Sequence, residues 1–211
     1  MTSDDILKYA RTLMMRIRFA HAYLNTYKAF CDNGKEYYEV MNQAPLFFAL
    51  TEKSLVTALM IEVCKLFEDS SQVMSIKKLY NICEQNKPLF PKMRLENGKE
   101  TNLPCNLEQI LKTTNTKFES YSTIILNVKA QRDKLWAHTD KACVLEPDKI
   151  EKEFPVTWGD IEELLNFASG FANSIIICFT NSIEAHWFNS PNSYEENVLY
   201  VLNSMKSGST G

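Results

Sequence analysis

Apolar residues recur every three or four positions along most of this chain, which is the spacing of helices that bury one face. Gly and Pro number only 6 and 7 among 211 residues, so few turns and long elements are expected. The first helix is expected over residues 4–31, with Ser3 as its N-cap. The same pattern predicts an all-α fold with further helices over residues 45–68, 73–85, 106–138, 157–187 and 194–205.

The helix expected over residues 45–68 is apolar around more than half of its circumference. Its main stripe includes Leu55, Leu59 and Val63, and Ala58 and Ile61 widen that stripe. Such a helix is central in a bundle or faces two partners at once. We therefore expect this helix, or the one over residues 106–138, to be partly buried against a second copy of the chain.

The second half of the chain is expected to contain a long helix, a loop and the start of a last long helix. A continuous helix over residues 106–138 would span on the order of 45 Å and run the full height of the bundle. Residues 140–156 are expected to form a loop, because Pro147 and Pro155 disfavour a helix. Thr157 and Asp160 resemble a capping box, with Asp in place of the usual Glu, and predict the start of the last long helix.

These elements predict an up-down helical bundle of four to five main helices, with short peripheral helices, over residues 1–190. Residues 86–105 contain three prolines and an Asn-Gly pair, which is typical of a surface loop. Residues 191–211 are expected to form a short helix followed by a flexible tail from Ser207 to the end.

Composition narrows the class of function. A net charge of −3 argues against a protein that coats nucleic acid nonspecifically, although it leaves room for a local basic patch. None of the 6 cysteines forms a C-x-x-C pair, so we expect neither a zinc site nor a disulfide framework. The first residues do not have the order of a secretion signal, and every long apolar run is interrupted by polar residues. We expect a cytoplasmic protein without a membrane span.

Candidate chemistry is concentrated at the end of the helix expected over residues 106–138. Arg132, Asp133 and His138 lie within seven residues there. A guanidinium can bind a phosphate through two hydrogen bonds, and an imidazole transfers protons near neutral pH. On an ideal helix Arg132 and His138 are about 120° and roughly 9 Å apart. Either the helix loosens near Ala137 and His138, or the two side chains meet across an interface.

The stretch Arg-Asp-Lys-Leu-Trp-Ala-His-Thr-Asp-Lys at residues 132–141 resembles the HEPN superfamily, whose members carry Arg-x(5)-His at the end of a long helix. It is most similar to the AbiU-type branch from abortive-infection phage defence. Residues 59–69, ending in Lys-Leu-Phe-Glu-Asp, and residues 157–165 also fit that branch. HEPN toxins that pair with a nucleotidyltransferase antitoxin often have a tyrosine where this chain has Asp140, so control by tyrosine modification is not expected here.

The resemblance implies a metal-independent endoribonuclease, usually a homodimer and often a toxin with an antitoxin partner or an antiviral effector. Arg132 and His138 would be the catalytic pair and Asp133 the supporting polar residue. In such chemistry the ribose 2′-OH attacks the adjacent phosphorus, so RNA is cleaved, DNA is not, and no cofactor or metal is needed. Asp140 would hold the His138 tautomer. The flanking phosphates would be bound by Lys129, Lys134 and Lys141.

Two alternatives need no catalysis. In the first, Arg132 is a surface ion-pair residue and His138 a cation at a helix C-terminus, where the helix dipole favours it. In the second, the chain has a HEPN fold without activity and acts as a dimeric interaction module in a defence or regulatory complex.

Overall fold

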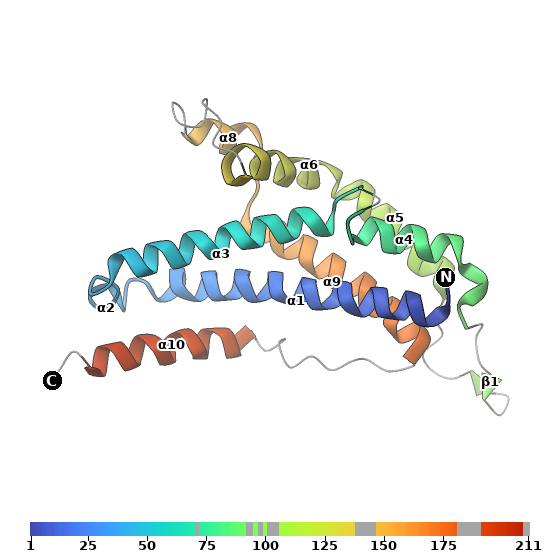
Figure 1. Ribbon diagram of the computed structural model, residues 1–211, viewed down its shortest axis with the longest axis horizontal. Coiled ribbons are helices and arrows are strands. Elements are labelled where there is room, and N and C mark those ends of the chain that lie inside the picture. The colour runs from blue at the N-terminus through green and yellow to red at the C-terminus, as the bar shows by residue number, and fades with distance from the viewer. Residues whose placement is uncertain are drawn as a thin grey trace.

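The computed structural model describes residues 1–70, 72–91, 95–96, 99–100, 106–137, 147–180 and 191–208. These residues form the predicted all-α bundle, accompanied by one small hairpin (Figure 1). The main helices are α1 (Ser3–Asn33), α3 (Pro45–Leu66), α4 (Ile76–Gln85), α5 (Leu107–Ser120), α6 (Ser122–Gln131), α9 (Trp158–Thr180) and α10 (Pro191–Gly208). Shorter segments are α2 (Tyr38–Met41), η1 (Lys87–Leu89), the π-helical η2 (Arg132–Ala137) and α8 (Pro147–Glu153).

Helix α1 lies at the centre of the fold and packs along α3 and α9, which crosses behind it in the view of Figure 1. Its 31 residues bury one continuous stripe that includes Leu13, Ile17 and Leu24. The opposing stripes come from Leu59 and Val63 of α3 and from a run of α9 residues. Burial of these aliphatic side chains is the main force that holds the three helices together.

Helix α1 begins one residue earlier than expected, because Thr2 and not Ser3 is its N-cap. The Thr2 hydroxyl accepts a hydrogen bond from the Asp5 amide at 3.2 Å, and the Asp5 carboxylate accepts one from the Thr2 amide at 2.8 Å. This reciprocal pair satisfies two amides that the first turn leaves free. Thr157 and Asp160 form the same arrangement before α9, which confirms the predicted start of that helix.

The prediction of one continuous helix over residues 106–138 is wrong. The segment divides into α5, α6 and η2, with a break at Tyr121, whose φ and ψ are −92° and 3°. The hydroxyls of Ser120 and Ser122 each donate to a carbonyl three residues earlier, which competes with regular helix geometry. The Tyr121 ring packs on Phe167 of α9, with 5.6 Å between centroids. The tertiary contact therefore fixes the break.

The loop expected over residues 140–156 is also partly wrong, because residues 147–153 form α8. Pro147 is the first residue of this helix, a position where the missing amide has no helical partner to lose. Ile150 of α8 is buried. Between α4 and α5, residues 86–105 contain η1 and the antiparallel strands β1 (Leu95–Glu96) and β2 (Lys99–Glu100).

Helix α10 is longer than the expected residues 194–205, and it includes Ser207 and Gly208 of the expected tail. Its buried side chains, Val198 and Leu202, pack in a second apolar cluster with Phe30 and Phe48. The Asn203 side chain also accepts a hydrogen bond from the Tyr37 hydroxyl at 3.0 Å. These contacts hold α10 beside α1 (Figure 1) and explain why the helix extends further than its own sequence pattern suggests.

Among the described residues, α9 is the one helix long and apolar enough to cross a membrane by length and composition. Half of its most apolar window is buried inside the bundle. A core helix of a globular protein meets the same criterion, and α9 packs against α1 in the core of this bundle.

Candidate functional site

The predicted site begins where α6 changes into the π-helical turn η2. Residues 132–137 adopt this geometry directly after Gln131, so the helix loosens from Arg132 onward, earlier than the expected place near Ala137 and His138, of which His138 lies outside the described residues. π-Helical turns are rare and often occur at functional sites, because they change the direction of the side chains that they carry. The loosening therefore begins at the first residue of the predicted catalytic pair.

The Arg132 guanidinium is bound from two sides. Its Nε donates to Oδ1 of Asp133 at 2.7 Å, and its Nη1 donates to Oε2 of Glu68 at 3.4 Å. The hydrogen bond with Asp133 is the main cause that raises the pKa of Arg132 above its ordinary value. Arg132 is thus a permanent positive charge that can stabilise an anion and cannot act as a proton donor or acceptor.

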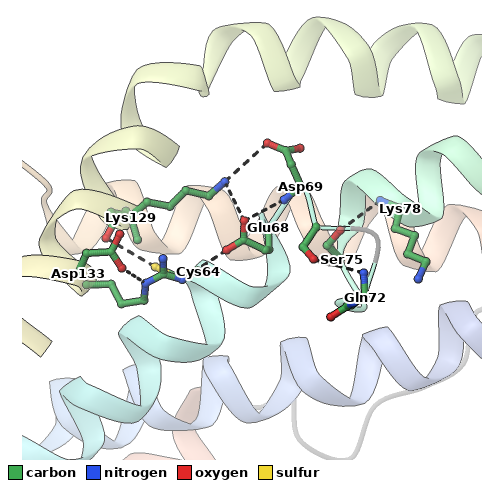
Figure 2. Close-up of polar contacts among 11 residues, drawn as sticks. Cys64, Glu68, Asp69, Gln72, Ser75, Lys78, Lys129 and Asp133 are labelled. Atoms are coloured by element: carbon green, nitrogen blue, oxygen red, sulfur yellow. Dashed lines mark hydrogen bonds and ion pairs between the residues drawn. The ribbon is translucent and has the colours of Figure 1, made fainter. Parts of the chain in front are cut away.

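Lys129 lies one turn before Arg132 and faces the same end of α3. Its ammonium is 3.8 Å from Oε1 of Glu68 and 3.7 Å from Oδ2 of Asp69 (Figure 2). A single carboxylate, that of Glu68, therefore bridges both cations through its two oxygens. Lys129, Arg132 and Glu68 are all partly buried, so water screens their interactions less than it screens those of exposed pairs.

A buried contact between α3 and α6 sets the position of this group. The Cys64 thiol lies one helical turn before Glu68 and donates to the Val128 carbonyl at 3.6 Å. Burial raises the pKa of Cys64 to about 12, against the opposite effect of the nearby Arg132 charge. Cys64 is therefore a packed thiol that aligns the two helices and is not a nucleophile near neutral pH.

Two polar side chains of α6 bind the backbone of the segment that leads into α9. The Asn127 side chain donates to the Pro155 carbonyl at 3.0 Å, and the Gln131 side chain donates to the Phe154 carbonyl at 2.7 Å. The Lys134 ammonium lies 4.3 Å from the centre of the Phe154 ring, which is a cation–π contact. Lys134, predicted to bind a flanking phosphate, is thus placed against Phe154.

Of the predicted site residues, the structure brings together Arg132, Asp133 and Lys129. His138, Asp140 and Lys141 lie outside the described residues, so their predicted roles stay predictions. Within the described part of the chain, no group of three or more His, Cys, Asp or Glu residues is placed to hold a metal ion.

Sequence reasoning missed Glu68 and Asp69 as members of the site. Their signal was present in the Lys-Leu-Phe-Glu-Asp stretch at the end of the second predicted helix, where two adjacent acids follow a lysine. Two adjacent acids at a helix C-terminus are unfavourable for the helix dipole, so they need another reason to be there. Lys129 and Arg132 provide that reason.

Comparison with known proteins identifies the family of this chain. A model of the family described as AbiU2, a HEPN family (HEPN_AbiU2), matches residues 4–199. No curated protein and no solved structure matches the chain. Because the match covers nearly all of the helical bundle, including the segment from Glu68 to η2, the chain belongs to the AbiU2 family of HEPN domains.

Proposed function

We propose that this HEPN domain of the abortive-infection type is a metal-independent endoribonuclease in a phage-defence or toxin–antitoxin system. The observation that carries the proposal is the position of Arg132. This guanidinium stands at the start of a π-helical turn, shares the Glu68 carboxylate with Lys129, and lies six positions before His138 in the sequence. A fixed cation pair at a loosened helix end is suited to binding the phosphate of a single RNA linkage.

The proposed reaction is attack of a ribose 2′-OH on the adjacent phosphorus, with departure of the 5′-oxygen. His138 transfers the proton, and Arg132 stabilises the negative charge that develops on the phosphorane oxygens. Asp133 holds Nε of Arg132 and Glu68 holds Nη1, so the guanidinium binds the phosphate through its N–H groups that these two carboxylates do not use. Asp140 orients His138, and Lys134 and Lys141 bind neighbouring phosphates. No cofactor is needed.

The spacing of Arg132 and His138 leaves two possibilities, a site within one chain and a site shared between two copies of the chain. The proposed partners are RNA, a second copy of the chain and an antitoxin protein. The proposed location is the cytoplasm.

The test is incubation of the pure protein with single-stranded RNA in EDTA. We expect cleavage that leaves 2′,3′-cyclic phosphate ends, and no cleavage of the matching DNA. His138→Ala and Arg132→Ala should each lower the rate at least ~100-fold, on the scale of lost acid–base or charge stabilisation. Lys112→Ala, which removes an exposed cation from α5, is the matched control and should leave the rate unchanged.

A second function, binding without catalysis, is favoured by the charge balance around Arg132. Three carboxylates, those of Glu68, Asp69 and Asp133, surround the two cations Lys129 and Arg132. This excess of negative charge weakens phosphate binding. If wild-type protein with an intact helical spectrum leaves every RNA uncut, the chain is an inactive HEPN interaction module.

A further inference from the structure

A groove of about 300 Å³ lies between helices α5 and α9. This volume is at the lower end of the range for small-molecule sites in proteins. The lining residues extend from Gln109 to Lys117 on α5 and from Asn166 to Ser174 on α9. On both helices they occupy positions i, i+1, i+4, i+5 and i+8, so each helix presents one continuous face to the groove. We call this site the α5–α9 groove.

The floor of the α5–α9 groove is apolar. Phe167 and Phe171 of α9 are each 4% exposed, and Thr114 of α5 is also buried. The Thr114 hydroxyl donates to the Ile110 carbonyl at 2.8 Å, so its proton is already used inside α5. The floor is therefore suited to the apolar body of a ligand.

The two rims of the groove are rows of small or polar residues spaced four positions apart. The Lys117 ammonium is 5.8 Å from the centre of the Phe167 ring, and Tyr121 packs on the same ring one turn later. The end of α5 thus lies beside the first lining residues of α9, and the two helices run in opposite directions. The rims therefore face each other in three layers, which are Lys117 with Asn166, Thr113 with Gly170, and Gln109 with Ser174.

The first layer supplies a positive charge. Lys117 makes no ion pair with any residue that the structure describes, and the Asn166 side chain makes no hydrogen bond with one. An ammonium and an amide N–H are both donors to an anion. A single lysine balances the one charge of a carboxylate, whereas a phosphate dianion would keep an unbalanced charge. This end of the groove therefore favours a carboxylate.

The last layer offers acceptors instead. The Ser174 hydroxyl donates to the Gly170 carbonyl at 2.8 Å, and Nε2 of Gln109 donates to Oγ1 of Thr113 at 3.2 Å. These bonds leave the Ser174 hydroxyl oxygen and Oε1 of Gln109 as acceptors at this end of the groove. Eight helical positions separate the two ends, which is about 12 Å. A ligand that fits both ends has an N–H donor about that far from its carboxylate.

The middle layer is open because of Gly170. Glycine inside a helix is less stable than alanine, so it needs a reason to be there. A Cβ at Gly170 would meet no atom of the described residues within 4 Å, so packing among those residues does not require glycine. The missing side chain keeps the rim low opposite Thr113, where a ligand can reach the floor.

We propose that the α5–α9 groove binds a small amphiphilic carboxylate. The anion is bound by Lys117 and Asn166, the apolar body covers the floor, and an N–H group of the ligand donates to Gln109 or Ser174. None of the groove residues belongs to the group around Arg132. The inference therefore goes beyond the proposed ribonuclease function, and either can fail without the other.

The test is a titration of the whole protein, labelled with nitrogen-15, with indole-3-butyrate followed by amide NMR. This probe combines a carboxylate, an apolar chain and ring, and one N–H donor. We expect saturable binding with a dissociation constant of about 1 mM or below, as is usual for a ligand of this size. The amide shifts should change within residues 109–117 and 166–174. The neutral methyl ester of the probe should bind at least ~5-fold more weakly, because it lacks the anion.

Two variants test the cation and the open middle layer. Lys117→Gln keeps a polar side chain without the charge and should weaken binding about fivefold to tenfold. Lys112→Gln, the same change at an exposed residue of α5 outside the groove, is the matched control and should bind as wild type does. Gly170→Leu should fill the groove and weaken binding at least ~10-fold. Its melting temperature should equal or exceed that of wild type, since leucine favours a helix.

Four results would overturn the proposal. They are the absence of saturable binding, shift changes centred on another surface such as the outward side of α3, equal affinity of the ester and the acid, and equal affinity of Lys117→Gln and wild type. Should Gly170→Leu lower the melting temperature, Lys117→Gln decides the result. A well-folded Gly170→Leu protein that binds the probe as wild type does would also contradict the site.

Discussion

Nη1 of Arg132 lies 3.4 Å from Oε2 of Glu68, so the end of α3 meets the first residue of the π-helical turn across 64 positions of sequence. The other oxygen of the same carboxylate is 3.8 Å from the Lys129 ammonium. Glu68 thereby links the segment that follows α3 to the helix that bears the candidate site (Figure 2).

Replacing Glu68 should weaken the positioning of Arg132, and Glu68→Ala should do so more than Glu68→Gln. Glu68→Gln keeps a carbonyl oxygen that accepts from Nη1, whereas Glu68→Ala removes the acceptor. We expect Glu68→Ala to lower the free energy of unfolding by about 1 kcal/mol, since the pair is only partly buried. RNA cleavage should fall about tenfold with Ala and less with Gln. Equal rates for wild type and Glu68→Ala would mean that Glu68 does not position Arg132.

Removing the cap of α9 should destabilise the bundle without affecting chemistry. The Thr157 hydroxyl accepts from the Asp160 amide at 3.1 Å and also donates to the Asp160 carboxylate at 2.7 Å. Thr157→Ala should lower the free energy of unfolding by about 1 kcal/mol, as loss of an N-cap usually does. Urea denaturation measures this loss, and Thr116→Ala on an exposed turn of α5 is the control. An unchanged midpoint would show that the cap contributes little.

His21 should make stability depend on pH. Burial is the largest cause that lowers the pKa of His21 below its ordinary value near 6.5, although Glu162 acts in the opposite direction. The unfolded chain therefore binds a proton at a higher pH than the folded protein does. Stability is then complete above pH 6.5 and falls as pH decreases toward the folded pKa, by at most about 1.4 kcal/mol per pH unit. His21→Gln should reduce this slope in denaturation curves between pH 7.5 and 5. A slope identical to that of wild type would contradict the assignment.

The cysteines should differ widely in reactivity. Burial raises the pKa of both Cys64 and Cys83 to about 12, whereas Cys31 is exposed. At pH 8 a thiol of that pKa is ionised in only about one molecule in ten thousand. Iodoacetamide should therefore label Cys31 in the native protein and label Cys64 and Cys83 only after unfolding, as peptide mass spectrometry would show. Native labelling of Cys64 at the rate of Cys31 would mean that the α3–α6 contact opens readily.

The sequence by itself determined those helix starts and apolar faces that depend only on residues close together in the chain. The capping box at Thr157 predicted the start of α9, because its two hydrogen bonds join neighbours in the chain. The apolar stripe of α1 and the broad apolar pattern of α3 likewise predicted an all-α bundle, since helical spacing alone decides which side chains share a face. The Arg132 stretch and the acidic end of the second helix also identified the family.

Only the tertiary structure decided features that depend on contacts between distant residues. Phe167 of α9 receives Tyr121 where the expected long helix breaks, and the apolar cluster around Phe30 and Phe48 extends α10. The same is true of the site, where Glu68 meets Arg132 because the Cys64–Val128 contact aligns α3 with α6. A sequence pattern records which face of a helix is apolar, but the partner of that face is fixed only when the helices pack.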